Sequence, residues 1–363
     1  MYDLIVIGGG PAGASAAITS CRTGAHVLLL ERGRFPRHKV CGEFVSAEAL
    51  GLLGSLLELT YSSLPYAVPI PRARFFVDDR VLEAAVQPAA ASIARLDLDR
   101  SLWDSAERCG TEARQQVIVQ NLSGSGPFVV CTSIGDFETR AVVNASGRWS
   151  TLNGAQSRNG NGGAKWIGLK AHYLEPAPPA SVDLYFFDGG YCGVQPVNLS
   201  SAHDQARVNA CAMVRADVAS TMPETFELHP ALRERAARWT PVMNPVGVSP
   251  LLFGKPRPIE GSVLSVGDAA GFVDPFVGDG ISLALRSGAL AAESLAPFFA
   301  GQLSLAQAIR QYAESYQLHF ASVFRSSSRI RRMLRLPRPV RAPILSLLAH
   351  STAVTEYLVR QTR

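Results

Sequence analysis

Three glycines near the start of the chain restrict its fold more than any other feature of the 363 residues. Gly8, Gly10 and Gly13 follow a short apolar run, and the small residues that come next are typical of a helix. A second apolar run then ends at Glu31. This order predicts a strand, a tight turn, a helix and a second, parallel strand. The chain is therefore expected to begin with the βαβ unit of an α/β fold.

The spacing of these glycines is typical of a turn that binds the pyrophosphate of a dinucleotide. The first glycine permits the turn, the second lets the backbone approach the phosphates, and the third lets the helix pack on the strand. The phosphates then lie at the positive end of the helix dipole. Glu31 is placed to accept hydrogen bonds from ribose hydroxyls, and an acid there argues against the 2′-phosphate of NADP. The residues predicted to contact the nucleotide are Gly8, Gly10, Pro11, Ala12, Gly13, Glu31 and Arg32.

This first turn does not distinguish FAD from NAD, but a second glycine-rich segment, 267–281, does. It resembles the flavin-side motif of the p-hydroxybenzoate hydroxylase-like flavoprotein superfamily. The resemblance implies that Asp268 binds the ribityl chain, Pro275 packs beside the isoalloxazine, and the amides of 278–281 cap its pyrimidine end. A helix N-terminus at this place can stabilise negative charge on reduced flavin. The residues that the resemblance adds to an FAD site are Gly267, Asp268, Pro275, Gly278, Asp279, Gly280 and Ile281.

Two further segments resemble parts of the same superfamily. Arg95, followed by Asp99 and Leu102, matches the segment whose first residue reaches the FAD pyrophosphate, and arginine suits that bidentate role. Residues 143–150 stand where hydroxylases of the superfamily carry an Asp-Gly motif. Here Ser146 replaces the aspartate, which argues against recognition of NAD(P)H at this place.

The loop 36–42 resembles the P-x-x-x-x-C-(A/G)-G loop of geranylgeranyl reductases, although Glu43 replaces the last glycine. The resemblance places Cys41 near the flavin, where we expect it to contact the cofactor or to act in catalysis; a simply packed thiol is the structural alternative. His38, Lys39 and Glu43 belong to the same loop and could relay a proton. His38 is nevertheless expected to be an exposed loop histidine.

The resemblance leaves the reaction open among three possibilities. Residues 189–196 lack the tryptophan and phenylalanine of the reductases' Y-x-W-x-F-P motif. This favours a single-component monooxygenase that is reduced by NAD(P)H and hydroxylates an apolar or aromatic, polyketide- or lipid-like molecule through a flavin C4a-hydroperoxide. The alternatives are a geranylgeranyl-reductase-like enzyme that reduces C=C bonds, and a non-catalytic FAD- or ligand-binding protein. No W-x-W-x-I-P motif accompanies Lys170, which argues against a tryptophan-type halogenase.

The order of elements predicts a discontinuous, glutathione-reductase-type FAD-binding domain, a mixed-sheet substrate domain and C-terminal helices. The FAD domain is assigned to 1–60, 95–160 and 255–300, the substrate domain to 61–94 and 161–254, and the helical extension to 301–363. Strands at 73–77 and 80–84 are expected to form a hairpin. The low-complexity stretch 153–163 is predicted to be a mobile loop or a domain crossing. The aromatic side chains expected to line the substrate pocket are those of Tyr185, Phe186, Phe187 and Tyr191.

Composition bears mainly on partners and compartment. The net charge is +5, and the basic residues are almost all arginine, with four lysines in the chain. The six cysteines show no CxxC spacing, so neither a metal site nor a disulfide framework is expected, and a reducing cytoplasm fits best. No apolar run is long enough to span a bilayer, and no nucleic-acid partner is expected. The Arg-rich segment 325–341 is either a solvated helix or a contact for a membrane surface or an acidic carrier.

Overall fold

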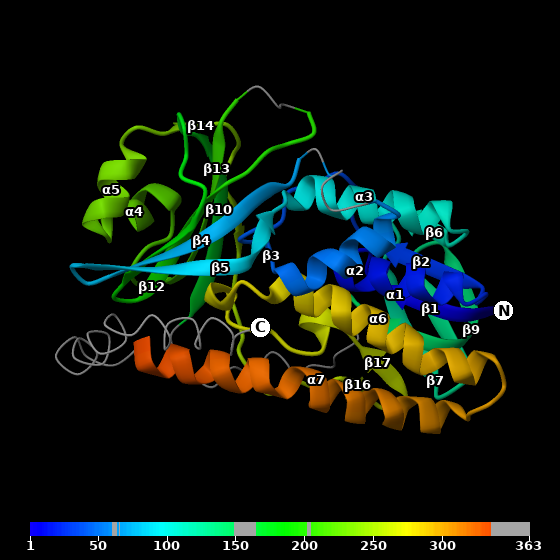
Figure 1. Cartoon of the computed structure of the whole chain (residues 1–363). Helices are drawn as coiled ribbons and strands as arrows, with labels where there is room; N and C mark the ends of the chain where they lie inside the picture. Colours follow the sequence, from blue (N-terminus) through cyan, green and yellow to red (C-terminus); the bar gives the residue numbers. More distant parts are fainter. Residues whose placement is uncertain (60–63, 65, 149–164, 202–204, 335–363) are drawn as a thin grey trace.

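The computed structural model describes residues 1–59, 64, 66–148, 165–201 and 205–334 and shows an α/β protein with two mixed sheets (Figure 1). The predicted fold class, with a βαβ unit, a second sheet and helices toward the C-terminus, is confirmed. The segment 153–163, predicted to be a loop or domain crossing, lies outside the described residues. Residues 335–363 also lie outside them, and these include three arginines of the segment 325–341.

The first sheet is built around the predicted βαβ unit. β1 (Tyr2–Ile7) pairs in parallel with β2 (Val27–Glu31) on one side and with β9 (Gly135–Asn144) on the other. The parallel pairing continues with β6 (Glu112–Gln115) beyond β2 and with β17 (Val263–Ser265) beyond β9. Antiparallel pairs add the short strands β7 (Val119–Gly124), β8 (Phe128–Thr132) and β16 (Ile259–Glu260).

Both faces of β1 are buried, which explains why its sequence is a continuous apolar run rather than an alternating one. Leu4 and Val6 pack in the cluster that contains the helices, whereas Ile5 and Ile7 pack with side chains of β7 and β8. The helices in that cluster are α1 (Pro11–Arg22), α2 (Ala47–Leu57), α3 (Arg95–Arg108), α6 (Gly280–Phe299) and α7 (Leu305–Leu334). Among the described residues, no helix combines the length and the apolar character needed to cross a bilayer.

Helices α1 and α6 approach each other closely because their contact is made by small residues. A Cβ on Gly288 of α6 would lie 2.1 Å from the carbonyl oxygen of Ala12, a distance that no side chain tolerates. The hydroxyl of Ser15 donates a hydrogen bond to the carbonyl oxygen of Leu285 at 2.7 Å. The small residues that the sequence shows after the first turn therefore serve this helix–helix contact.

The second sheet has the strand order β14-β10-β13-β12-β11-β4-β5-β3, with β15 beside β10. Its central strands are β10 (Trp166–Leu174), β13 (Arg207–Arg215), β12 (Gly190–Pro196) and β11 (Val182–Phe187). β4 (Val68–Val77) and β5 (Arg80–Ser92) form the predicted hairpin, which is longer than predicted, and β4 runs parallel to β11. The short strands are β14 (Thr240–Pro241), β15 (Val246–Val248) and β3 (Phe44–Val45), the last of which comes from the first 60 residues.

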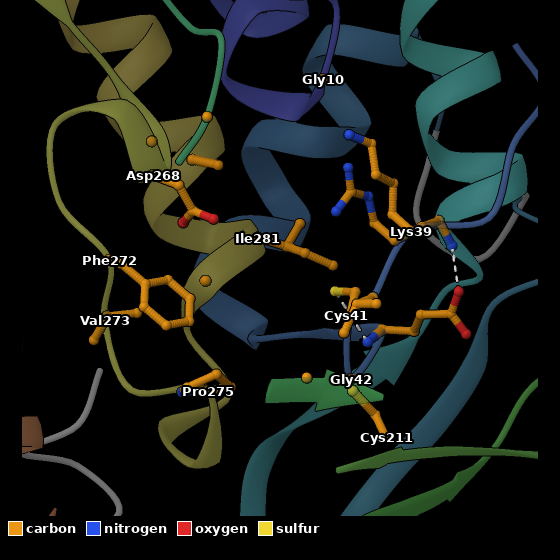
Figure 2. Close-up of a pocket in the computed structure, with 18 of the residues that line it drawn as sticks. Gly10, Lys39, Cys41, Gly42, Cys211, Asp268, Phe272, Val273, Pro275 and Ile281 are labelled. Atoms are coloured by element: carbon orange, nitrogen blue, oxygen red, sulfur yellow. Dashed lines mark hydrogen bonds between the residues drawn. The ribbon is translucent and has the colours of Figure 1, made fainter. Parts of the chain in front are cut away.

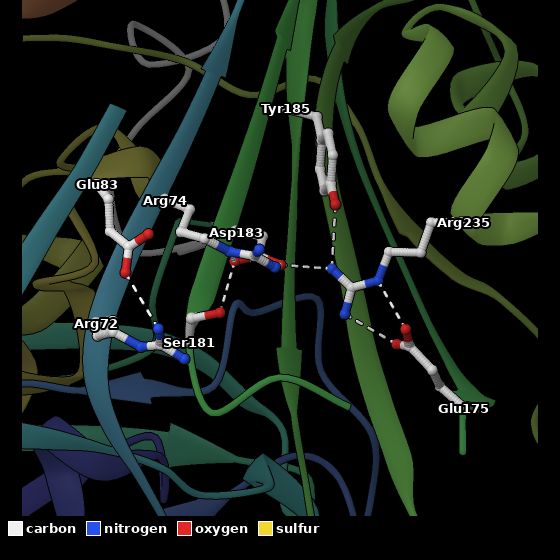
Figure 3. A network of polar contacts seen from close by, with 8 residues as sticks. All are labelled: Arg72, Arg74, Glu83, Glu175, Ser181, Asp183, Tyr185 and Arg235. Carbon is white, nitrogen blue, oxygen red and sulfur yellow. Dashed lines mark hydrogen bonds and ion pairs between the residues drawn. The ribbon is translucent and has the colours of Figure 1, made fainter. Parts of the chain in front are cut away.

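One face of this sheet packs beneath α4 (Met222–Glu227) and α5 (Pro230–Ala236), and a polar network fixes α5 to it (Figure 3). Arg235 of α5 pairs with Glu175 at 2.9 Å and with Asp183 at 2.6 Å, and it donates a hydrogen bond to the Tyr185 hydroxyl at 3.1 Å. Arg74 of β4 pairs with the opposite side of Asp183. Since Asp183 is fully buried, these two arginines supply the positive charge that its carboxylate needs there.

We expect the substitution Arg235→Met to lower the free energy of unfolding by about 3 kcal/mol, because it leaves two buried or half-buried carboxylates short of a partner. The matched control is Arg72→Met, which breaks a pair with Glu83 whose side chains are both about half exposed. This control should cost less than about 1 kcal/mol. Urea unfolding of both variants measures the difference, and equal losses would show that the network around Arg235 has no special weight.

Candidate functional site

A single cavity of about 820 Å³ lies between the two sheets and joins the two glycine-rich segments. Figure 2 shows Asp268, Phe272 and Pro275 on one side of it, and Lys39 and Cys41 on the other. Its walls come from both glycine turns, from the loop 37–43 and from one face of the second sheet. The structure thus brings together segments that lie more than 200 residues apart in the sequence.

The three glycines of the first turn have different tasks. A Cβ on Gly13 would lie 1.8 Å from the carbonyl oxygen of Gly8, and Gly8 itself has a φ of +110° with its missing Cβ pressed against Ala145. A Cβ on Gly10 would meet only the Arg95 guanidinium, at 3.9 Å. Gly8 and Gly13 are thus required by the fold, whereas Gly10 keeps open the space in front of α1.

That space is suited to an anion. Helix α1 begins with no side-chain cap and no acid in its first turn, so its first N–H groups remain available. The buried guanidinium of Arg95 lies beside it, held by two hydrogen bonds of 2.7 Å to Asp99. Burial lowers the pKa of Lys39 to about 8, with further lowering from Arg37 and Arg95, which shows how much positive charge is gathered here. A pyrophosphate fits this chemistry, and the sequence had singled out neither Arg37 nor Lys39 for it.

Glu31 lies at the other end of the same turn, as its position after the second strand predicts. Its carboxylate is buried, accepts hydrogen bonds from the N–H groups of Gly9 at 2.9 Å and Gly33 at 2.7 Å, and pairs with Arg37 at 2.8 Å. Burial opposes ionisation, but Arg37 and these N–H groups outweigh it and lower the pKa of Glu31. An ionised acceptor at the cavity wall fits a ribose diol. Arg32 also lines the cavity and is exposed.

The second turn presents its polar groups to the same cavity. Gly267 has a φ of +56°, and its N–H donates to the Ser287 hydroxyl at 2.9 Å. Asp268 pairs with Arg148 at 3.4 Å, and this arginine lies over the Phe272 ring at 4.4 Å. Helix α6 begins at Gly280 without a side-chain cap, so a second set of free N–H groups faces the cavity. The remaining cavity-lining residues from the predicted set are Pro275, Gly278, Asp279 and Ile281.

Asp279 is the most perturbed carboxyl of the second turn. It is 2% exposed, one of its oxygens has no partner among the described residues, and Ser46 donates to the other at 3.4 Å. Burial raises its pKa from 3.8 to about 6, although Arg286 opposes the shift. The acid therefore holds a proton well into the range where an exposed aspartate has lost it.

Two uncapped helix N-termini facing one cavity, with an acid at the ribose position and arginine at the phosphate position, define the site of a flavoprotein oxidoreductase. A family model described as FAD binding domain matches residues 1–326 of the chain. The chain belongs to that family, which confirms the resemblance found in the sequence and supports FAD as the cofactor.

Comparison with known proteins finds relatives that match along most of the chain. The chain is 26% identical to digeranylgeranylglycerophospholipid reductase 2 of Methanopyrus kandleri, over 89% of this chain and 84% of that protein. It is 24% identical to the menaquinone reductase of Mycolicibacterium smegmatis, over 93% and 85%, respectively. It is 25% identical to conditioned medium factor receptor 1 of Dictyostelium discoideum, over 90% and 69%.

Solved structures share the fold at lower identity. The flavin-dependent brominase Bmp2 superposes with a TM-score of 0.77 at 19% identity and covers 99% of this chain and 93% of its own. A geranylgeranyl bacteriochlorophyll reductase-like protein from Thermoplasma acidophilum gives 0.77 at 18% identity and covers 99% and 95%. These likenesses concern the fold, which the family uses for several reactions.

The part of the cavity beside the second sheet is apolar. Among the described residues of that sheet, no charged side chain lines the cavity. The larger side chains of its wall are Phe75, Val86, Leu184, Phe186, Tyr191 and Met213. Phe186 and Tyr191 are therefore placed as expected.

The structure places Tyr185 and Phe187 elsewhere, so their prediction as pocket residues was wrong. Both pack in the cluster on the opposite face of the sheet, beneath α4 and α5. The reason is the alternation of side chains along β11, which turns Leu184 and Phe186 toward the cavity and their neighbours away from it. The sequence shows this alternation but not which set faces the ligand.

The loop with Cys41 lies at the cavity, yet its best-anchored residue is Glu43. The carboxylate of Glu43 pairs with Lys170, and it lies 2.9 Å from Nε2 of His172 and 2.7 Å from the backbone N–H of Arg95, which donates to it. All three side chains, Glu43, Lys170 and His172, are at most 1% exposed. The sequence analysis had set Lys170 aside, although a lysine and a histidine two positions apart on one predicted strand were a visible signal.

We expect the substitution Gly10→Val to lower FAD affinity by at least about a hundredfold, or roughly 3 kcal/mol, while the protein still folds. The valine has room beside Arg95 but fills the space in front of α1. The control Gly51→Ala adds a methyl group where no atom lies within 4 Å, and should bind FAD normally. Flavin absorbance per protein and the unfolding midpoint are the measurements; normal flavin content in Gly10→Val would place the phosphates elsewhere.

Asp279 also gives the flavin-free protein a characteristic pH dependence. Between 3.8 and about 6 the folded state keeps a proton that the unfolded chain has lost, so stability falls as the pH rises through this range. The substitution Asp279→Asn should remove this fall and raise stability at pH 7 by up to about 3 kcal/mol. Denaturant unfolding at pH 4, 5, 6 and 7 tests it, and parallel curves for both proteins would refute the shift.

Proposed function

We propose that the protein is an FAD-dependent reductase of an apolar, lipid-like substrate, with NAD(P)H as the electron donor. The observation that carries this proposal is the continuity of the cavity. The same space that begins at the two glycine turns extends along the uncharged face of the second sheet. An apolar substrate lying on that face therefore reaches the reactive end of the cofactor without leaving a water-poor environment.

The reductive chemistry is supported by the curated relatives. Two of them are named as reductases, one of digeranylgeranylglycerophospholipid and one of menaquinone, and both of these compounds are lipids. The loop 36–42 resembles that of geranylgeranyl reductases, and its Cys41 lines the cavity. These two observations lead us to favour reduction over the hydroxylation that the altered segment 189–196 suggests.

The residues of the chain divide the work as follows. The N–H groups of α1 and the guanidinium of Arg95 hold the pyrophosphate, and Glu31 holds the ribose. Asp268 and the first N–H groups of α6 hold the ribityl chain and the pyrimidine end. When bound, FAD supplies the transfer of two electrons and a hydride. The wall made by Leu184, Phe186 and their neighbours excludes water and orients the apolar substrate.

Hydroxylation remains the second candidate, because residues 189–196 lack the aromatic residues of the reductase motif. One experiment decides between the two. The FAD-loaded protein is reduced with NADH or NADPH and mixed with a prenylated naphthoquinone or with geranylgeraniol, with and without oxygen. Products heavier by two hydrogens, formed without oxygen, support the reductase; products heavier by one oxygen, formed only with oxygen, support the monooxygenase. If neither nucleotide bleaches the flavin, the proposed electron donor is wrong.

We expect Leu184→Asp to raise the KM for an apolar substrate at least about tenfold while flavin content stays normal, because the carboxylate enters the apolar wall and loses more than about 1.4 kcal/mol of substrate binding. The matched control is Val81→Asp, on the hairpin of the same sheet, where the side chain is 56% exposed. Steady-state kinetics and flavin absorbance are the measurements. Equal effects at the two positions would argue against the sheet face as the substrate wall.

A further inference from the structure

A buried cluster of charged groups lies directly behind the loop that carries Cys41. Glu43 accepts hydrogen bonds from Lys170, from the backbone of Arg95 and, at 2.9 Å, from Nε2 of His172. Its own carbonyl oxygen accepts from the N–H of Ile93 at 2.9 Å. The cluster therefore connects the loop with β10 of the second sheet and with the start of α3.

The conformation of Glu43 shows that this arrangement is specified rather than incidental. Its φ is +62°, in the left-handed region that costs free energy for a residue with a side chain. Burying a carboxylate and an ammonium group is also costly, and apolar residues of similar size often stabilise a core more. A purely structural function does not explain why three polar contacts converge on one strained position next to the cavity.

His38 connects this cluster with the cavity. Its ring lines the cavity and stands edge-on to the ring of His172, with 5.3 Å between the ring centroids. Nδ1 of His38 is buried without a partner among the described residues, which leaves Nε2 as the ring nitrogen that is open. Nδ1 of His172 is also buried and without a partner. The expectation that His38 is an exposed loop histidine was wrong, because the loop folds inward against β10.

We propose that His38 is the acid–base residue of the cavity, and that Glu43, Lys170 and His172 are positioning residues that set its protonation. This inference rests on the proposed reductase function. Saturation of one C=C bond requires a hydride at one carbon and a proton at the other. The reduced cofactor gives the hydride and is oxidised, the protonated imidazole of His38 gives the proton from Nε2, and water then returns a proton to His38.

The charges that face His38 act on its pKa in opposite directions. Burial lowers the pKa, and the positive groups Lys170 and His172 of β10 lower it further, whereas Glu43 of the loop and Asp97 of α3 raise it. Removal of the Glu43 charge should therefore lower the pKa of His38, and removal of the Lys170 charge should raise it. Damage to the ion pair alone would affect both variants in the same way, so the sign of the shift distinguishes the two explanations.

The experiment compares Glu43→Gln and Lys170→Met with the unaltered FAD-loaded protein. The rate at which the reduced protein is reoxidised by a prenylated naphthoquinone is measured against pH without oxygen, and the titration of His38 is followed by NMR of ¹³C-labelled histidine, assigned with His38→Asn. The rate should fall as the pH rises through the pKa of His38. This fall should move to lower pH in Glu43→Gln and to higher pH in Lys170→Met. His38→Asn should abolish it and slow the reaction about a hundredfold.

Controls keep the result decisive. Glu175→Gln changes a carboxylate in the network on the opposite face of the sheet and should leave the His38 titration unmoved. If Glu43→Gln or Lys170→Met does not fold, Asp97→Asn takes its place, with an expected shift to lower pH. Shifts of the same sign in Glu43→Gln and Lys170→Met, or an unchanged profile in His38→Asn, would overturn the proposal. If the unaltered protein reduces no quinone, the proposed function fails, and the NMR shifts alone then support or overturn the influence of the cluster on His38.

Discussion

The contact between α1 and α6 is the constraint on which the site depends. These two helices come from opposite ends of the described chain, and each begins at a glycine turn without a side-chain cap. They can approach only because Gly288 brings no side chain against the backbone of Ala12. The close approach directs both N-termini at one cavity, so that two regions of positive potential face a single ligand. A cofactor with a phosphate end and a polar ring end is what such a pair can hold.

The rest of the cavity is completed by the loop 37–43 and by the second sheet. This loop contributes cations near α1 and, a few residues further on, Cys41 near the apolar wall. Its position is fixed from both sides: Asn209 of β13 donates to the carbonyl oxygens of Cys41 and Gly42, at 3.1 and 2.9 Å, and Glu43 is held by β10 and α3. The loop thus acts as the joint between the cofactor part and the substrate part of the cavity.

The sequence could predict what is encoded locally. The turn at Gly8–Gly13 and the acid at Glu31 lie within one βαβ unit, where spacing alone determines the geometry. The second turn was found through its resemblance to a family rather than through physics. The side of the second sheet that faces the ligand depends on which layer packs against it, so Tyr185 and Phe187 were assigned to the wrong face. The partners of Glu43 lie 127 and 129 residues away, and no local pattern joins them.

Strand β11 serves two layers at once. Its even-numbered residues form the apolar wall, while Asp183 and Tyr185 hold α5 through Arg235. Because a shift by one residue exchanges the two faces of a strand, an insertion or deletion here would turn an aspartate into the cavity and a leucine toward the arginines. Homologous chains can therefore adapt to new ligands by exchanging single side chains along this strand, whereas changes of length must be confined to the turns at its ends.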